Sequence, residues 1–421
     1  MARSRPMSLQ VRRIYGALSE GEFLELIRMG KNIVILCDGT SNEISKDRTN
    51  ILRLYGCLKK SDTQSVFYDP GVGTFGAENS ASYYYRRGVE IWGLATGWGL
   101  DKNVKEAYRF LVHNYQDETG KTTGAQADKI FIFGFSRGAY TARVLAGFIH
   151  AFGLLHKDNL NLLDYAYRAY KGVGSKVADE KDVGAFAELR LFERILRPKR
   201  PQIRMLGLFD TVGSVIESGR YGPRLRSHAF TSTNPSVETV RHAVALDERR
   251  TMFQPQLWRT GGVFQSERFD PDTEQEQDAK EVWFVGSHGD VGGGYPEPKS
   301  GLAKITLDWM IQEAKHTELD FDQGAIDHLV LGKSADRPIG PTADAARNSS
   351  MTLGWAAVEF LPRVKRRHVR TRRSTLAGIY LPLFEERIVP EGANIHSSVF
   401  EHDASPNQIK RSNVPEDVVK V

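Results

Sequence analysis

The sequence has little cysteine, no long apolar run and no strong excess of charge of either sign. Its 421 residues include only two cysteines, Cys37 and Cys57, so no disulfide framework is expected to hold the fold. The most apolar long run, Val144–Leu155, is too short to span a bilayer. Lysine and arginine exceed aspartate and glutamate by 57 − 52 = 5, which is too small and mixed a difference to predict a nucleic-acid partner.

What is present is the composition of an ordinary globular protein, with 40% apolar and 26% charged residues. Length alone suggests two or three domains, but α/β enzymes with insertions often exceed the usual size as one domain. Arginines at positions 3, 5, 12 and 13 resemble the start of a signal peptide, yet serine and glutamate residues between 19 and 25 interrupt any apolar core. We therefore expect a cytoplasmic protein in which residues 1–30 form an N-terminal helical extension.

The stretch Asp128–Arg143, DKIFIFGFSRGAYTAR, reads as a buried strand that runs directly into G-x-S-x-G and then into a helix. This is the context of a nucleophile elbow, which lifts a serine hydroxyl above the end of a sheet. Ser136 is the expected nucleophile, and Gly134 and Gly138 leave room for the sharp turn. The backbone N–H of Arg137 is the first expected oxyanion donor. A Gly-Ser turn that opens an ordinary helix is the competing interpretation.

A second strand-and-loop unit lies earlier, where the apolar run Asn32–Cys37 ends in DGTSN. The loop is expected to supply the second oxyanion N–H from Gly39 or Thr40. An aspartyl phosphotransferase motif is disfavoured, because Leu36 stands where its nucleophilic aspartate is needed. A simple turn that caps a helix explains Asp38 equally well.

The segments around these units have weaker signals. We expect a short strand at Val66–Asp69, an amphipathic helix at Asn103–Gln116 and further helices within Leu154–Arg197. The aromatic, glycine-rich segment 75–100 either lines an acyl pocket or packs on itself, and the sequence does not decide between these alternatives.

Candidates for the acid and the base of a catalytic triad follow in chain order. The strand Gln202–Phe209 ends in Asp210, which suits the orienting acid, although an aspartate that caps a helix is a real alternative. Val282–Val285 is a last strand, and His288 stands in the glycine-rich loop after it. The order Ser…Asp…His is that of α/β-hydrolases, so His288 is the expected base. Asp290 is the rival acid and, like Asp38, a possible support for the site.

Other polar residues receive structural interpretations. His242 falls in RHAVALDERR, which reads as a helix, so we expect this histidine to be structural although its proximity to the site stays open. The acidic stretch 259–281 is expected to be a solvated loop, and Leu302–Ala314 a helix. No metal site and no cofactor are expected.

Six separated motifs, CDGTSN, DPGVGT, FGFSRGAYTAR, FDTVGS, RHAVALDERR and WFVGSHGDVGGGY, occur in this order, and IHSSVFEH follows near the C-terminus. In these motifs the chain resembles a family of bacterial and fungal α/β-hydrolase domains that includes phospholipase effectors of type VI secretion systems. The resemblance implies a serine phospholipase or esterase that uses Ser136, Asp210 and His288. For an effector it also implies export by a type VI route and a delivery or immunity partner. The secreted effectors usually carry an additional membrane-binding module, which we do not expect here.

The expected architecture is one α/β-hydrolase domain over 31–421, with a mostly parallel central sheet flanked by helices. Inserted segments are expected near 155–200 and 215–280, and a C-terminal extension over about 320–421. In that extension Arg363–Arg373 holds seven basic residues in eleven, either as a solvated segment or as a peripheral membrane contact for a phospholipid substrate.

The expected function is hydrolysis of carboxylic esters, with lipid or phospholipid as the substrate class, through an acyl-enzyme on Ser136. The alternative is a catalytically idle relative of such enzymes that serves as a binding scaffold. The intact set of serine, aspartate and histidine in the required order favours the enzyme.

Overall fold

The computed structural model describes residues 30–39, 48–71, 99–117, 127–177, 186–213, 216–219, 222–225, 228–267, 270–364, 371–376, 378–404, 411 and 413–421. The expected N-terminal extension, Thr40 and nearly all of the aromatic segment 75–100 lie outside these residues. Among the described residues, no helix combines the length and the apolar character that a membrane span needs.

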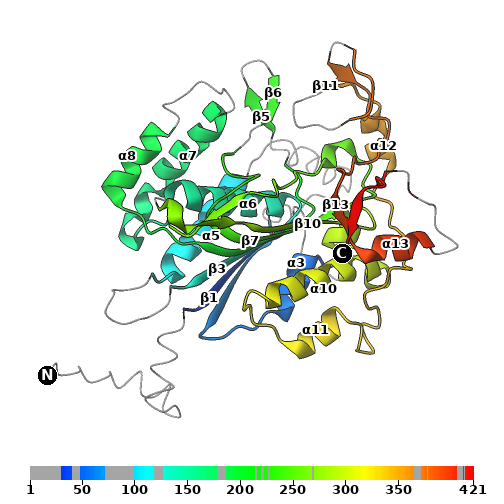
Figure 1. Ribbon diagram of the computed structural model, residues 1–421, viewed down its shortest axis with the longest axis horizontal. Coiled ribbons are helices and arrows are strands. Elements are labelled where there is room, and N and C mark those ends of the chain that lie inside the picture. Colours follow the sequence, from blue (N-terminus) through cyan, green and yellow to red (C-terminus); the bar gives the residue numbers. More distant parts are fainter. Residues whose placement is uncertain are drawn as a thin grey trace, which may run out of the picture.

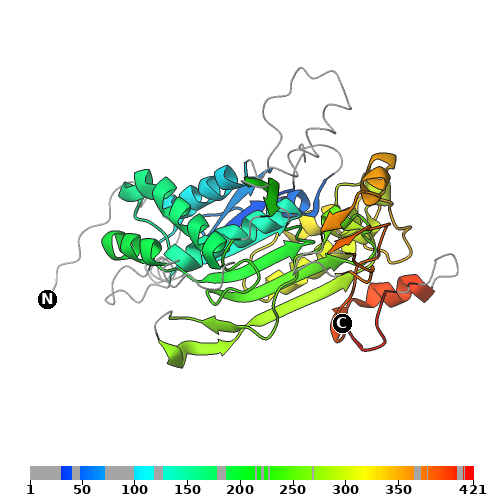
Figure 2. The same ribbon diagram turned by 90° about the horizontal axis from the view of Figure 1, so that it is seen from above.

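A central sheet of eight strands, all paired in parallel, organises the molecule (Figures 1 and 2). The strand order is β14-β13-β10-β7-β4-β3-β1-β2. The prediction of an α/β fold with a mostly parallel sheet is therefore confirmed. The bounds are β1 Asn32–Cys37, β2 Gln64–Asp69, β3 Lys129–Phe135, β4 Ile203–Phe209, β7 Val237–Ala245, β10 Asp278–Phe284, β13 Ala393–Ile395 and β14 Val418–Lys420.

Helices cover both faces of the sheet, as Figure 1 shows. Alternate residues of β1 point into two separate apolar clusters, with Ile33 and Ile35 in one and Val34 and Leu36 in the other. This alternation follows from the two-residue period of a strand. The first cluster is completed by α5 Leu100–Asn114, α6 Arg137–Phe152, α7 Leu163–Val177 and α8 Ala187–Leu196. The second is completed by α3 Asn50–Cys57, α10 Gly301–Lys315 and α11 Gln323–Leu329.

The strand order reverses next to β1, because the chain passes from β1 outward to β2 and then back to β3 on the other side. In open α/β sheets, the crevice at such a switch point, outside the carboxyl ends of the strands, is where ligands bind. Cys37 at the end of β1 pairs with Gly134 near the end of β3. The Asp38 loop and the Ser136 turn therefore leave the sheet side by side.

Several strands and helices were predicted from the sequence and are confirmed with small shifts of their ends. The strands β1 and β4 and the helices α5, α6 and α10 lie where they were expected. The strand predicted at Val282–Val285 is present as β10 and begins earlier, at Asp278, but it is not the last strand, because β13 and β14 follow it in the same sheet. The segment 154–197 is largely helical, with η1 Lys157–Leu162 before α7 and α8. The predicted strand Val66–Asp69 begins two residues earlier, at Gln64.

Two predictions were wrong. RHAVALDERR is not a helix, because its first half, Arg241–Ala245, belongs to β7, a central strand that is buried over nearly its whole length. A strand covered on both faces has a near-continuous apolar pattern, which periodicity cannot distinguish from a buried helix. The acidic stretch 259–281 is not simply a solvated loop. It forms the hairpin of β8 Val263–Gln265 and β9 Glu274–Glu276 and then enters β10, where Glu281 is buried.

The C-terminal third of the chain adds to the central sheet and to its surroundings. It contains α12 Leu353–Glu359, the two-stranded hairpin of β11 Arg363–Val364 and β12 Ile379–Tyr380, and α13 Ser397–Ala404. It also supplies β13 and β14 at one edge of the sheet. Another small hairpin, β5 Ile216–Gly219 with β6 Gly222–Leu225, precedes β7.

Candidate active site

The turn between β3 and α6 holds Ser136 in a strained backbone conformation. Its φ of 58° and ψ of −120° lie in a region that residues other than glycine rarely adopt. The two neighbouring glycines are required by close packing. A Cβ on Gly134 would lie 2.4 Å from the Gly138 carbonyl oxygen, and a Cβ on Gly138 would lie 2.2 Å from the Cys37 carbonyl oxygen. The predicted strand–turn–helix context of Ser136 is therefore present.

Three side chains from distant parts of the sequence form one line of hydrogen bonds. His288 Nε2 lies 2.8 Å from Ser136 Oγ, and His288 Nδ1 lies 2.5 Å from Asp210 Oδ2. Asp210 follows β4, and His288 is the first residue of the short helix α9 His288–Gly292, where the sequence predicted a loop. The serine hydroxyl can donate to the imidazole, and the imidazole N–H can donate to the carboxylate. The structure thus brings together the three residues that were expected to form the triad.

The carboxylate of Asp210 has a second neighbour, the guanidinium of Arg387, which the sequence did not predict. Arg387 donates from Nη1 to Oδ1 at 2.6 Å and from Nη2 to Oδ2 at 3.0 Å, and the backbone N–H of Ala245 donates to Oδ1 at 2.9 Å. Both ion-pair partners are buried. Burial acts to raise the pKa of Asp210, but the Arg387 guanidinium and the His288 hydrogen bond outweigh it and hold that pKa well below its usual range.

Two aromatic rings pack on the imidazole of His288, and a second carboxylate contacts its backbone. The ring of Phe135 lies 4.7 Å and that of Phe253 4.9 Å from the imidazole, centroid to centroid. The backbone N–H of His288 donates to Glu248 Oε2 at 3.2 Å. Burial acts to raise the pKa of Glu248, but the Arg250 guanidinium outweighs it and lowers this pKa to about 2. Glu248 lies in the motif RHAVALDERR, so a signal for it was present in the sequence.

Asp290, the rival acid, has a different set of partners. Its carboxylate accepts hydrogen bonds from the Ser287 backbone at 2.9 Å and from the Asn348 side chain at 2.6 Å, and with Ser287 it forms the capping box of α9. Burial raises the pKa of Asp290 to about 6, although these hydrogen bonds favour the ionised form. Asp290 therefore holds the helix that begins with His288, while Asp210 contacts the imidazole itself.

Of the expected oxyanion donors, one adjoins Ser136, one is hydrogen-bonded within its own loop, and one lies outside the described residues. Arg137 is the first residue of α6, so its backbone N–H adjoins Ser136, as an elbow donor should. The backbone N–H of Gly39 donates to Asp38 Oδ1 at 2.6 Å, so this donor is engaged within its own loop. Asp38 also accepts from Thr49 Oγ1 at 2.5 Å and from Tyr68 Oη at 2.8 Å. Asp38 thus fixes the end of β1, and Thr40 lies outside the described residues.

His242 lies in the sheet and is fully buried. Its Nδ1 is 2.8 Å from Glu281 Oε2, and its Nε2 accepts a hydrogen bond from the Thr211 backbone at 3.2 Å. Burial lowers the pKa of His242 below its usual value, although Glu281 acts in the other direction. This histidine supports the backbone next to Asp210 and does not reach Ser136 through any described contact.

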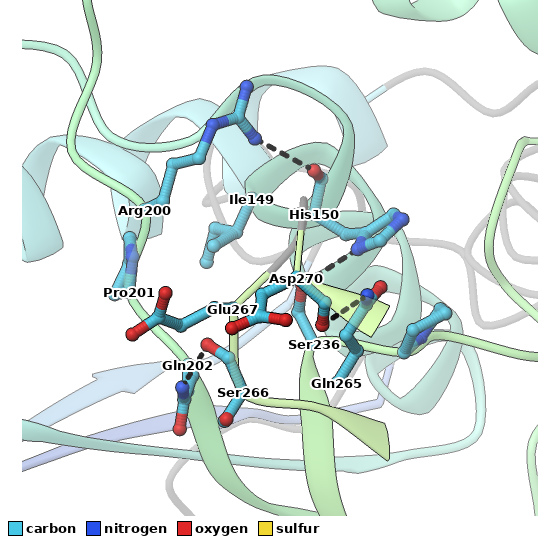
Figure 3. Close-up of a pocket in the computed structure, with 11 residues that line it drawn as sticks. Ile149, His150, Arg200, Pro201, Gln202, Ser236, Gln265, Ser266, Glu267 and Asp270 are labelled. Atoms are coloured by element: carbon cyan, nitrogen blue, oxygen red, sulfur yellow. Dashed lines mark hydrogen bonds between the residues drawn. The ribbon is translucent and has the colours of Figure 1, made fainter. Parts of the chain in front are cut away.

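A pocket of about 400 Å³ opens at the end of the sheet opposite to the candidate active site (Figure 3). Gln202 and Ser236 line it, and they directly precede β4 and β7, so the pocket lies at the amino ends of strands whose carboxyl ends face the triad. In this pocket, His150 Nδ1 is hydrogen-bonded to Ser236 Oγ at 2.7 Å. Because of this position, the pocket is not part of the candidate active site. Among the described residues, no group of histidine, cysteine or carboxylate side chains is placed to hold a metal ion.

Parts of this chain are similar to parts of known proteins. One solved structure, of an uncharacterised protein from Pseudomonas aeruginosa, is 18% identical, with a TM-score of 0.40, over 79% of this chain and 52% of that one. Another, a Tle1 effector bound to the VgrG spike of the type 6 secretion system, is 20% identical, with a TM-score of 0.31, over 63% of this chain and 51% of that one.

An uncharacterised protein of Saccharomyces cerevisiae is 35% identical over 238 residues, which are 53% of this chain. The match covers only 32% of the yeast protein. Residues 31–313, more than half of the chain, match the family model of the Tle1-like phospholipase effector catalytic domain of type VI secretion systems. The chain therefore belongs to the Tle1-like phospholipase effector catalytic domain family.

Proposed function

We propose that this chain hydrolyses the acyl esters of phospholipids through a serine acyl-enzyme. The observation that carries the proposal is the line of hydrogen bonds from Ser136 Oγ through His288 to Asp210. Family membership supports the substrate class. The position of the line at the switch point of the sheet supports it as a site, because that is where a substrate would enter.

The roles follow from the geometry. His288 Nε2 removes the proton of Ser136 Oγ as the oxygen attacks the ester carbonyl, and the imidazolium that forms is stabilised by the carboxylate of Asp210. The same imidazolium then protonates the departing alcohol. In the second half of the reaction, His288 activates a water that attacks the acyl-enzyme and frees Ser136.

The tetrahedral intermediates need donors for a negative oxygen. The backbone N–H of Arg137, beside Ser136 at the start of α6, supplies one donor together with the positive end of the helix dipole. The second donor is expected from the loop after β1. If it is Gly39, its N–H must leave Asp38 Oδ1 when substrate binds. Loss of one such donor typically costs about 3 kcal/mol of transition-state stabilisation.

The alternative, an idle relative that serves as a scaffold, is favoured by one observation. Arg387 forms an ion pair with Asp210, and a carboxylate that already pairs with one cation stabilises an imidazolium less well than an unpaired carboxylate does. Only a measurement of reactivity at Ser136 separates the two functions.

The decisive experiment is labelling with a fluorophosphonate, which reacts with activated serines. The wild-type protein should form an adduct and Ser136→Ala should not, while Ser61→Ala, a change at an exposed serine, should label like wild type. Release of fatty acid from phospholipids with labelled sn-1 and sn-2 chains should fall about a thousandfold or more in Ser136→Ala. An adduct that persists in Ser136→Ala, or its absence in wild type, would refute the enzymatic function.

A further inference from the structure

A cluster of charged side chains beside α3 and α10 carries more positive than negative charge. The two helices lie side by side on one face of the sheet (Figure 1), and their apolar residues belong to the same core cluster. Arg53 of α3 is 1% exposed, and Lys304 of α10 is fully buried. Buried cations are stable only when anionic or accepting groups pair with them. The partners of these two side chains are therefore informative.

One carboxylate is shared by three cations. Glu297, in the short helix η4 Glu297–Lys299, has its Oε1 2.5 Å from Lys304 Nζ. Its Oε2 lies 3.0 Å from Arg337 Nη1 and 3.5 Å from Arg53 Nη2. Among the described residues, no second carboxylate forms an ion pair with any of the three cations. The formal charge of this group of four side chains, here called the Glu297 cluster, is 3 − 1 = +2.

Arg53 is the cation with the weakest contacts. Its Nη1 contacts Asn50 Oδ1 at 3.5 Å, which is at the outer limit of a hydrogen bond, as is its contact with Glu297. Its Nε is buried and has no hydrogen-bond partner in the described part of the chain. A guanidinium has five N–H donors, so this buried side chain keeps donors without a close acceptor. Such donors in a positively charged setting indicate a place for an anion.

The outer side of the Glu297 cluster is in contact with solvent, and a fourth cation lies there. The side chains of Glu297 and Arg337 are 17% and 16% exposed. Arg48 precedes α3 and is half-buried. Burial and the nearby Arg337 lower the pKa of Arg48, while Glu297 and the exposed Asp336 act in the other direction. An anion between Arg48 and Arg337 relieves the repulsion between these two cations.

The Glu297 cluster lies beside α9, the helix that begins with the candidate base. The Arg48 carbonyl accepts a hydrogen bond from the Gly294 backbone at 3.2 Å, and Asn50 donates from Nδ2 to the Val291 carbonyl at 2.9 Å. Both contacts are to α9 or to the residues directly after it. A ligand held by the cluster is therefore next to an element of the candidate active site.

We propose that the Glu297 cluster, together with Arg48, binds the phosphate group of an anionic ligand. A phosphate monoester carries close to two negative charges at neutral pH, which balances the charge of the cluster. Its oxygens also accept the paired N–H donors that guanidinium groups present. The ligand is either a soluble phosphate ester or a lipid head group, because both present this chemistry. The site goes beyond the proposed ester hydrolysis, since no step of that reaction uses it.

Isothermal titration calorimetry with inorganic phosphate, at constant ionic strength in chloride buffer, tests the site. Ser136→Ala protein should bind phosphate saturably, and Arg337→Gln in the same background should bind it about tenfold or more weakly, because a charge-assisted contact is lost. The matched control, Arg204→Gln, removes an arginine that pairs with Glu238 and should bind phosphate normally. Because no turnover is measured, a failure here is distinct from a failure of the fluorophosphonate labelling.

Glu297→Gln distinguishes a phosphate site from a purely structural ion cluster. The substitution removes the carboxylate that competes with the ligand, so phosphate should bind about tenfold more tightly. In chloride buffer this variant should melt at a lower temperature than wild type, and phosphate should restore most of the difference. A purely structural cluster would lose stability in this variant and gain none from phosphate.

Two further ligands identify the source of the phosphate group. Glycerol 3-phosphate and dihexanoyl phosphatidic acid, the latter below its micelle-forming concentration, carry the same group without and with acyl chains. Tighter binding of the lipid to Ser136→Ala protein would assign the site to a head group. Equal or tighter binding of glycerol 3-phosphate would assign it to a soluble ester.

Three results would overturn the proposal. The first is inorganic phosphate that gives neither a heat of binding nor a rise in melting temperature, and this result needs no variant of the cluster. The second is unchanged phosphate affinity in Arg337→Gln, because phosphate would then bind elsewhere. The third is a Glu297→Gln protein that phosphate stabilises no more than it stabilises wild type.

Discussion

Arg387 is the residue that most distinguishes the candidate site from a simple serine, histidine and aspartate set. It gives Asp210 a full cationic partner in a buried setting, so the carboxylate stays ionised at all ordinary pH values. Both side chains contact the same carboxylate, His288 through Nδ1 and Arg387 through Nη1 and Nη2. Arg387 is therefore a positioning residue that fixes the carboxylate to which His288 is hydrogen-bonded.

The first prediction concerns Arg387→Met. Without the guanidinium, the buried carboxylate of Asp210 loses the strongest of the interactions that lower its pKa, and the buried ion pair loses one partner. The free energy of unfolding, measured with urea at pH 7, should fall by about 3–5 kcal/mol. Arg387→Lys, which keeps the charge, should retain more of this stability. An unchanged free energy of unfolding in Arg387→Met would show that Arg387 does not stabilise the fold through Asp210.

No sequence pattern pointed to Arg387, which lies 177 residues after Asp210 in a segment without a recognisable motif. The meeting of Ser136, Asp210 and His288 was predictable, because each of them follows a strand, and parallel strands bring their carboxyl ends to the same end of the sheet. The ion pair between Arg387 and Asp210 depends on where the guanidinium lies in three dimensions. The packing of the C-terminal third of the chain sets that position, and no local sequence pattern contains it.

At the scale of elements, the sequence predicts the strands with strong apolar runs, whereas the pattern of the β7 segment predicts a helix. The segment VETVRHAVA places an arginine and a histidine inside a buried strand, and only their partners explain this. Arg241 pairs with Asp278 and Glu313, and His242 with Glu281. These partners lie on β10 and α10, so no local reading of the sequence contains them.

The helix α9 carries the second prediction, because its first residue is His288 and its cap is Asp290. Burial raises the folded-state pKa of Asp290 to about 6, above the unfolded value of about 3.9. The stability linked to this group is therefore fully present below about pH 4 and is lost as the pH rises through about 6. Between these limits the loss is about 2–3 kcal/mol.

Asp290→Asn cannot titrate, so the difference in unfolding free energy between wild type and this variant should shrink by that amount from pH 4 to pH 7. Urea unfolding at several pH values measures it. Thr352→Val, which removes the side-chain cap of α12 without changing a titratable group, is the control and should show no such trend through pH 6. A constant difference for Asp290→Asn would mean that the hydrogen bonds from Asn348 and Ser287 keep the carboxylate ionised throughout.

At the scale of the whole molecule, the folded unit extends beyond the last residue of the family match. The match stops at residue 313, but β13 and β14 extend the sheet beyond β10, and Arg387 reaches back to the triad. Ile395 and Val399 also belong to the second apolar cluster. The residues after 313 are thus part of the same core and of the same site.

The last prediction follows from the contribution of the residues after 313 to the core and to the site. A chain cut after residue 313 should lack a cooperative thermal transition and should not react with a fluorophosphonate, because β10 loses β13, one of its two neighbouring strands, and Asp210 loses Arg387. The loss of a partner from a buried ion pair alone typically costs about 3–5 kcal/mol. A chain that lacks only 418–421 loses the edge strand β14 and should still unfold cooperatively, at a lower temperature. Labelling of the 1–313 fragment at the full-length rate would instead show that the triad forms without the C-terminal third.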